Sequence, residues 1–307
     1  LAGRLNDYYC FLHDNNQFTK CEAYIEESVS IRADLCREDP ETYEPDLAGS
    51  YNNLANLYSD TQRFQESEAM HKLALAIRER LAKANPQAYG PDLSGSYYNL
   101  GNLYKKTQRF QESEEMHKSA LAIYERLAKA NPQAYEPDLA LSYNNLAVLY
   151  SDTQRFQESE EMYQLAIAIR ERLAKANPQA YEPDLARLYN NLGNLYKKTQ
   201  RFQECEAMYN SALAIRERLA KANPQAYEPD WLFHITTWPS CIAISSGSKK
   251  AKRCTSWHWL YVNAWRRQIR RHTSRNWLLH ITTWLIYIAL PNGSRKAKRC
   301  TSWHWLY

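Results

Sequence analysis

The sequence repeats itself every 46 residues, and this period constrains the fold more than any other feature of the chain. Periods of roughly 20–50 residues are typical of arrays in which each unit covers its apolar face with the next unit. The full repeats span residues 45–90, 91–136, 137–182 and 183–228, and residues 1–44 form a diverged first repeat. Because the chain starts at Leu1, in the middle of a repeat, we expect it to be a fragment of a longer protein.

Each repeat carries two helical patterns separated by a polar break, which is residues 59–63 in the repeat 45–90. We expect the first helix of that repeat to begin at Asp46, a good N-cap residue. The second pattern should end at Asn85, because a residue before proline disfavours the helical conformation. Residues 87–92 would then link one repeat to the next. Short links between helices give antiparallel pairs, so the sequence predicts an all-α fold, an α-solenoid of stacked helix pairs.

The pattern resembles the tetratricopeptide repeat. That family places a bulky residue, Leu, a small residue and Tyr along one face of its first helix, and this sequence has Tyr51-Leu54-Ala55-Tyr58, Tyr97-Leu100-Gly101-Tyr104, Tyr143-Leu146-Ala147-Tyr150 and Tyr189-Leu192-Gly193-Tyr196. The small residue expected early in the second helix is Ser67, Ser113, Ser159 or Cys205. The phrases NNLA and ALAIRERL are most similar to the repeats of kinesin light chains. Because those repeats are about four residues shorter, we expect roughly one additional turn of ~3.6 residues per repeat here.

The last 77 residues, 231–307, differ from the array in composition, since they hold all nine Trp and thirteen Lys or Arg but no Asp or Glu. They nevertheless keep the 46-residue period, because residues 231–261 recur as 277–307. Shifting the reading frame by one base turns codons for Trp-Leu into codons for Leu-Ala, which the array carries at these positions. We therefore interpret the segment as a frameshifted translation of the same repeat, and we expect a poorly ordered, basic, Trp-rich tail.

The frameshift also accounts for motifs in this tail that would otherwise suggest a function. Cys254 with His258 and Cys300 with His304 have a spacing that hints at zinc, but we predict no metal site. Basic runs beside Trp residues predict non-specific binding of nucleic acid at low salt rather than specific recognition. The apolar stretch 277–290 is too short to span a membrane. No cofactor-binding motif occurs in the chain, so we expect no cofactor.

Polar residues form a stripe along the first helices, and the resemblance places this stripe on the concave face that binds peptides. We predict a peptide groove formed by Asn52, Asn56, Tyr98, Asn102, Lys105, Lys106, Asn144, Asn190, Asn194, Lys197 and Lys198. An Asn amide both donates and accepts hydrogen bonds, so it can bind the main chain of an extended peptide. The alternative is that the asparagines were copied by duplication and are merely solvated.

The charges at the ends of the first helices alternate along the array, with Ser-Asp at 59–60 and 151–152 and Lys-Lys at 105–106 and 197–198. This alternation predicts a partner of mixed charge, although a two-repeat duplication explains it equally well. A carboxylate clamp of the chaperone-binding members is not expected, because Arg187 is the only cation near the start of a first helix.

The residues that could support catalysis have simpler interpretations. His71 and His117 alternate with Tyr163 and Tyr209 at one position, which indicates packing. The glutamate runs 111–116 and 157–162 are typical of a solvated helix face. The cysteines of the array show no metal-ligand spacing and are expected to be buried thiols in a reducing compartment such as the cytoplasm: Cys10, Cys21, Cys36 and Cys205.

The sequence therefore predicts a non-catalytic scaffold whose partner is a protein or an extended peptide, with no specific nucleic acid as a partner. Because the last repeat lacks a following helix, we also expect end-to-end self-association. One alternative is that the array is the sensor arm of a larger signalling ATPase or protease. Another is that the chain is the product of a decayed gene.

Overall fold

A computed structural model describes residues 1–14, 18–223 and 227 of the chain. This part of the chain folds into α-helices joined by short turns. The described residues divide into two units, residues 1–195 and the described residues from 196 onward. The helices of the described part are α1 (Ala2–Asp14), α2 (Phe18–Glu38), α3 (Pro40–Asp60), α4 (Phe64–Ala84), α5 (Pro86–Lys106), α6 (Phe110–Ala130), α7 (Pro132–Asp152), α8 (Phe156–Ala176), α9 (Pro178–Lys198) and α10 (Phe202–Ala222). The predictions for residues 231–307 lie outside the described residues.

Each helix pair is joined to the next through a single residue, which is Asp39 after the first pair and an asparagine in the later pairs. Asn85 ends α4 and also caps α5, since its side chain accepts a hydrogen bond from the Ala88 amide at 3.1 Å. The predicted end of the second helix at Asn85 is therefore confirmed, but the predicted link at residues 87–92 is wrong. Proline at the first helical position is compatible with a helix, because the amide it lacks would have no partner there.

The prediction that Asp46 begins a helix is also wrong, because Pro40 is itself the first helical residue and the helix starts earlier. Asp39 is the N-cap of α3, accepting from the Thr42 amide at 3.2 Å, and the helix then runs through Pro45 to Asp60. An internal proline removes one hydrogen bond, but its fixed φ is itself helical. With the earlier start, α3, α5, α7 and α9 are each 21 residues long, the same length as α4, α6, α8 and α10.

Within a pair, the turn between helices depends on a glutamine in the left-handed region. Gln62, Gln108 and Gln154 have φ of 64°, 62° and 62°. The threonine before each glutamine closes the preceding helix, as where Thr153 Oγ1 donates to the Leu149 carbonyl at 2.9 Å. The same turn recurs in every full repeat, so the pairs present equivalent faces to one another.

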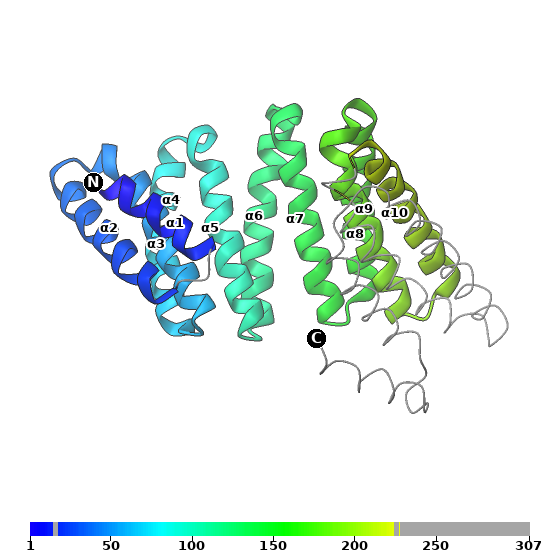
Figure 1. The fold of residues 1–307 in the computed structure, drawn as a ribbon, viewed down its shortest axis with the longest axis horizontal. Helices are drawn as coiled ribbons and strands as arrows, with labels where there is room; N and C mark the ends of the chain where they lie inside the picture. The colour runs from blue at the N-terminus through cyan, green and yellow to red at the C-terminus, as the bar shows by residue number, and fades with distance from the viewer. Residues whose placement is uncertain (15–17, 224–226, 228–307) are drawn as a thin grey trace, which may run out of the picture. The chain divides into compact units, whose positions relative to one another are not determined.

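In the unit 1–195, successive helices pack side by side from α1 to α8 (Figure 1). The leucine of each first helix is buried, with 4% of Leu54, 2% of Leu100 and 1% of Leu146 exposed. The small residue of each second helix lets the two helices approach closely. Ser113 Oγ donates to the Gly101 carbonyl at 2.8 Å, and Ser159 Oγ to the Ala147 carbonyl at 2.7 Å. The predicted all-α stack of helix pairs is confirmed.

An arginine before each second helix connects adjacent pairs. The Arg109 guanidinium lies 4.1 Å from the centre of the Tyr104 ring and donates to Glu68 of the preceding repeat at 2.5 Å. The Tyr104 hydroxyl donates to the same glutamate at 3.1 Å. Arg155 makes the equivalent contacts with Tyr150 and Glu114.

This network corrects the interpretation of the run 111–116 as a solvated face. Glu114 belongs to that run, but its side chain is only 17% exposed because it lies between Arg155 and Lys118. The two cations hold the pKa of Glu114 below its usual range, although burial opposes them. The run thus contributes to the contact between repeats.

None of the helices in the described part of the chain is both long enough and apolar enough to cross a membrane.

Replacing Leu146 with Ala should lower the free energy of unfolding by ~2–5 kcal/mol, because the side chain is fully buried between helix pairs. Denaturant unfolding measures this change. Leu165→Ala is the matched control, since the Leu165 side chain is 44% exposed and the same atoms are removed. Equal losses in the two variants would contradict the assigned core.

Replacing Asn131 with Ala should lower the free energy of unfolding by about 1 kcal/mol, because the Asn131 side chain accepts a hydrogen bond from the Ala134 amide at 3.3 Å and caps α7. Asn131→Asp retains an acceptor and matches Asp39 at the equivalent position, so it should cost much less. A loss in the Asp variant as large as that in the Ala variant would show that the cap is unimportant.

Candidate functional site

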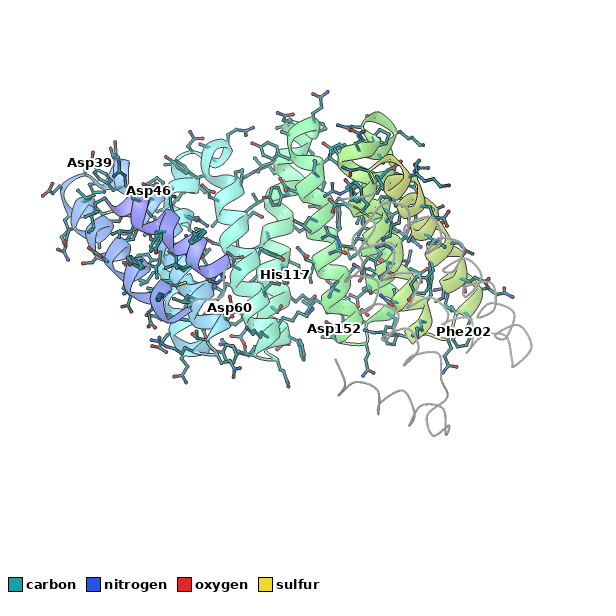
Figure 2. All side chains as sticks on the ribbon, in the orientation of Figure 1. Asp39, Asp46, Asp60, His117, Asp152 and Phe202 are labelled. Atoms are coloured by element: carbon teal, nitrogen blue, oxygen red, sulfur yellow. The ribbon has the colours of Figure 1, made fainter. Side chains whose placement is uncertain are left out.

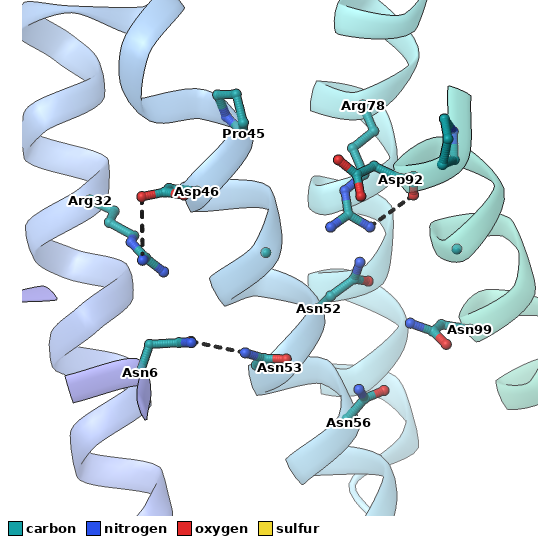
Figure 3. Close-up of a pocket in the computed structure, with 13 residues that line it drawn as sticks. Asn6, Arg32, Pro45, Asp46, Asn52, Asn53, Asn56, Arg78, Asp92 and Asn99 are labelled. Atoms are coloured by element: carbon teal, nitrogen blue, oxygen red, sulfur yellow. Dashed lines mark hydrogen bonds and ion pairs between the residues drawn. The ribbon is translucent and has the colours of Figure 1, made fainter. Parts of the chain in front are cut away.

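A polar hollow of about 390 Å³ lies among helices α1 to α5 (Figure 3). Five asparagines from three helices contribute to its wall: Asn6, Asn52, Asn53, Asn56 and Asn99. Two aspartates and two arginines complete the polar lining: Asp46, Asp92, Arg32 and Arg78. Gly49 and Gly95 keep the hollow open, because a Cβ on either glycine would meet nothing within 4 Å.

A buried chain of hydrogen bonds forms the back of the hollow. His71 Nδ1 donates to Asn52 Oδ1 at 2.9 Å, and Asn52 Nδ2 donates to Ser96 Oγ at 3.2 Å. Arg78 donates to the same hydroxyl at 2.8 Å and to the Asp92 carbonyl at 3.0 Å. Since Asn52 is only 5% exposed, this side chain holds α3, α4 and α5 together.

Asparagines of neighbouring repeats also bind one another. Asn53 donates to Asn6 at 2.9 Å across α3 and α1, and Asn191 donates to Asn144 at 3.0 Å across α9 and α7. Asn56 and Asn99 differ, because they make no hydrogen bond with any other residue of the described chain while both line the hollow. Their amides are available to a ligand.

The two arginines are fixed by contacts with the following first helix. Arg32 is buried and pairs with Asp46 at 3.4 Å, while it also donates to Ser50. Burial lowers the pKa of Arg78, and the charge of Asp92 opposes this shift. The hollow therefore presents cations, carboxylates and amides in one wall, which suits the polar main chain of a peptide better than an apolar ligand.

The alternating charges that we predicted to face a partner largely neutralise one another. Lys105 pairs with Asp152 of the next repeat at 2.8 Å. Lys106 pairs with Asp60 of the preceding repeat at 3.9 Å and donates to the Ser59 carbonyl at 2.9 Å. Asp60 and Asp152 are labelled at the ends of α3 and α7 in Figure 2. The alternation thus supplies ion pairs between repeats.

The other predicted groove residues occupy different environments. Tyr98 is half-buried beside His117, with ring centres 5.8 Å apart. Asn190 and Lys197 are half-buried, and Asn102, Asn194 and Lys198 are exposed. The structure brings only Asn52 and Asn56 of the predicted set into the polar hollow.

Sequence reasoning missed Asn53, Asn99, Arg32 and Arg78. Two signals could have revealed them. The asparagines occur as doublets at 52–53, 144–145 and 190–191, and a helix turns by 100° per residue, so both members can contribute to adjacent walls; Asn99 is the counterpart of Asn53 one period later. The arginine recurs in the ALAIRERL phrase at the same position of several repeats.

The histidines are packing residues, as predicted. His71 and His117 are 2% and 3% exposed. Their pKa values are lowered to about 4, chiefly by burial and secondarily by the charges of Arg78 and Lys105 respectively. Among the described residues, no group of three His, Cys, Asp or Glu side chains could hold a metal ion.

The prediction of buried thiols holds for Cys21 and Cys205 but is wrong for Cys10, which is exposed, and Cys36, which is half-buried. On α1 the inward position is taken by Tyr9, so the next residue points away from the core.

Lowering the pH from 7 to 4.5 should lower the Tm through these histidines. The unfolded chain binds a proton at each histidine near pH 6.5, whereas the folded chain does so only near pH 4. Their contribution to stability is therefore complete above pH 6.5 and is lost as the pH falls toward 4. The double variant His71→Tyr His117→Tyr carries at both positions the residue that the following repeat has, Tyr163. Its Tm should change less with pH over this range. An unchanged slope would contradict the buried, neutral state.

Comparison with known proteins identifies related repeats. Family models for the tetratricopeptide repeat match residues 46–126 and 92–172, and a second such model matches residues 185–225. The crystal structure of BtubC (BKLC) from P. vanneervenii is similar, with a TM-score of 0.64 and 25% identity, covering 84% of this chain and 94% of that one. A kinesin-light-chain-like protein of Podosopora anserina with nearly identical TPR-like repeats has a TM-score of 0.55 and 21% identity, covering 73% and 98%.

The apo form of RapI also shares the fold, with a TM-score of 0.60 and 12% identity over 88% of this chain and 85% of that one. The comparison with curated proteins found no match. The predicted likeness to kinesin light chain repeats is confirmed.

Proposed function

This chain belongs to the tetratricopeptide repeat family, and we propose that it is a non-catalytic scaffold that binds an extended peptide in the polar hollow. Tetratricopeptide repeats generally bind proteins or peptides. The observation that carries the proposal is the pair of uncommitted amides, Asn56 and Asn99, on facing helices of an open hollow. Each amide offers a donor and an acceptor, which matches the alternating groups of a peptide main chain.

The geometry favours recognition of the main chain over recognition of apolar side chains. Neighbouring polar groups are already satisfied within the protein, so the wall is preorganised and loses little side-chain freedom when a ligand binds. We propose that the groove continues along the unit 1–195 past Asn102, Asn144, Asn190 and Asn194, with Lys105 and Lys106 at its rim.

The absence of catalysis is part of the proposal. It is supported by the burial of His71 and His117, whose lowered pKa values leave them neutral and away from solvent. The buried thiol of Cys21 has a pKa raised by burial, which makes it unreactive and consistent with a reducing compartment such as the cytoplasm. We further propose no specific nucleic acid partner and self-association through the last repeat.

Capture of peptides from a random extended library tests the proposal. The double variant Asn56→Ala Asn99→Ala should bind captured peptides at least tenfold more weakly, because each side chain contributes hydrogen bonds of about 0.5–1.5 kcal/mol. Asn210→Ala, which alters an exposed asparagine of α10, should bind them as well as the wild type does. Affinity is measured by fluorescence anisotropy.

Equal affinity of the double variant and the wild type would overturn the site. Failure of the wild type to capture any peptide would overturn the function. Asn102→Ala Asn144→Ala then tests the extension of the groove, since a weaker interaction is expected only if the ligand extends beyond the polar hollow.

A further inference from the structure

The third repeat contains a small hollow of about 80 Å³ that differs in character from the polar one. Three helices contribute to it, α5, α6 and α7, in the middle of the unit 1–195, where Figure 2 labels His117. Its wall combines three aromatic side chains with one carboxylate: Tyr98, His117, Tyr124 and Asp138. The Tyr98 and His117 rings are inclined at 56° with their centres 5.8 Å apart, so they form two sides of a concave wall.

This hollow arises where the repeat pattern loses an arginine. The position of Arg32 in the first repeat is also an arginine in the second, fourth and fifth repeats (Arg78, Arg170 and Arg216), but Tyr124 occupies it in the third repeat. Arg32 pairs with Asp46 at 3.4 Å, and Arg170 pairs with Asp184 at 3.1 Å. Asp138 occupies the equivalent position after Tyr124, and a tyrosine supplies no charge to it.

The Asp138 carboxylate makes no hydrogen bond or ion pair with another described residue. The charge of Arg170 acts on it, but the Arg170 guanidinium already donates to the Pro137 carbonyl at 2.8 Å and pairs with Asp184. Burial raises the pKa of Asp138, and the charge of Arg170 only partly opposes this shift. A half-buried carboxylate without a partner is unfavourable, so a cation that entered the hollow would relieve this cost.

The aromatic rings favour the same kind of ligand. Faces of aromatic rings carry negative charge density and attract cations, and guanidinium groups also stack on them. The pKa of Tyr124 is raised to about 12, chiefly by burial and then by Asp138, so this side chain stays neutral at pH 7. Since the hollow exceeds the ~30 Å³ of one water molecule, it has room for the head group of a side chain that enters from outside.

We propose that the hollow among α5, α6 and α7 binds the guanidinium of an arginine in the partner peptide, which takes the place of the arginine missing from the third repeat. This inference rests on the proposed function and adds to it one side-chain preference of the ligand. The remaining repeats supply the cation from their own chain, so the third repeat is the one, among residues 1–195, that is open to an external arginine.

Binding of N-acetyl-arginine amide tests the inference independently of the polar hollow. Citrulline amide is the control ligand, because it has nearly the same shape as arginine and no charge. In NMR titrations, the arginine compound should shift the ring signals of Tyr98 and Tyr124 and lower the pKa of Asp138. The citrulline compound should do neither.

Two variants assign the effect to this hollow. Tyr124→Arg restores the residue of the other repeats, so its own guanidinium should fill the site and weaken binding at least tenfold. Asp138→Asn keeps the shape and removes the charge, and it should weaken binding by a similar factor. Asp34→Asn is the charge-matched control, since Asp34 lies exposed on α2 beside Arg37, and its affinity should equal that of the wild type.

Equal shifts with the arginine and citrulline compounds, or wild-type affinity in both Tyr124→Arg and Asp138→Asn, would overturn the inference. Thermal unfolding establishes that the variants are folded, and Asp138→Asn keeps the test valid if Tyr124→Arg is unstable. If the wild-type protein captures peptides but does not bind the arginine compound, this inference alone is refuted. If the wild-type protein binds the arginine compound but captures no peptide, the proposed function alone is refuted.

Discussion

The burial of one leucine per helix pair against its neighbours is the interaction on which the rest of this structure depends. Leu54, Leu100 and Leu146 are almost fully buried, and each requires an adjacent pair to cover it. Because a repeat array gains its stability from nearest-neighbour contacts, the same register is imposed at every step. This register places equivalent polar residues of successive first helices side by side, which produces the polar hollow.

The polar residues divide into those that hold the array together and those that remain available. Asn52 is committed to His71 and Ser96, and Asn53 to Asn6, whereas Asn56 and Asn99 have no such partner in the described part of the chain. The charged residues divide similarly, since Lys105 and Lys106 are paired with aspartates of the repeats on either side. A repeated sequence thus gives a wall that is mostly satisfied internally, with the open positions set by small differences between repeats.

Most of the fold could be predicted from the sequence, because the spacing of Leu54, Ala55 and Tyr58 and the Asn-Pro at 85–86 are local signals. The start of each first helix could not, since Pro86 is equally compatible with a turn and with the first residue of a helix. The site was only partly predictable. Whether an asparagine is free depends on contacts between residues 44 to 47 positions apart, as in Asn52 with Ser96 and Asn53 with Asn6, and such contacts are fixed only when the helices pack.

The central claim is that the free amides of the hollow bind the main chain of a peptide. The most direct measurement compares the affinity of one captured peptide with that of the same peptide N-methylated along its backbone, which removes the main-chain donors and keeps every side chain. The account predicts that methylation of the residues that contact α3 and α5 abolishes binding, while conservative changes of the peptide side chains facing these helices are tolerated. Undiminished binding of the methylated peptide would contradict it.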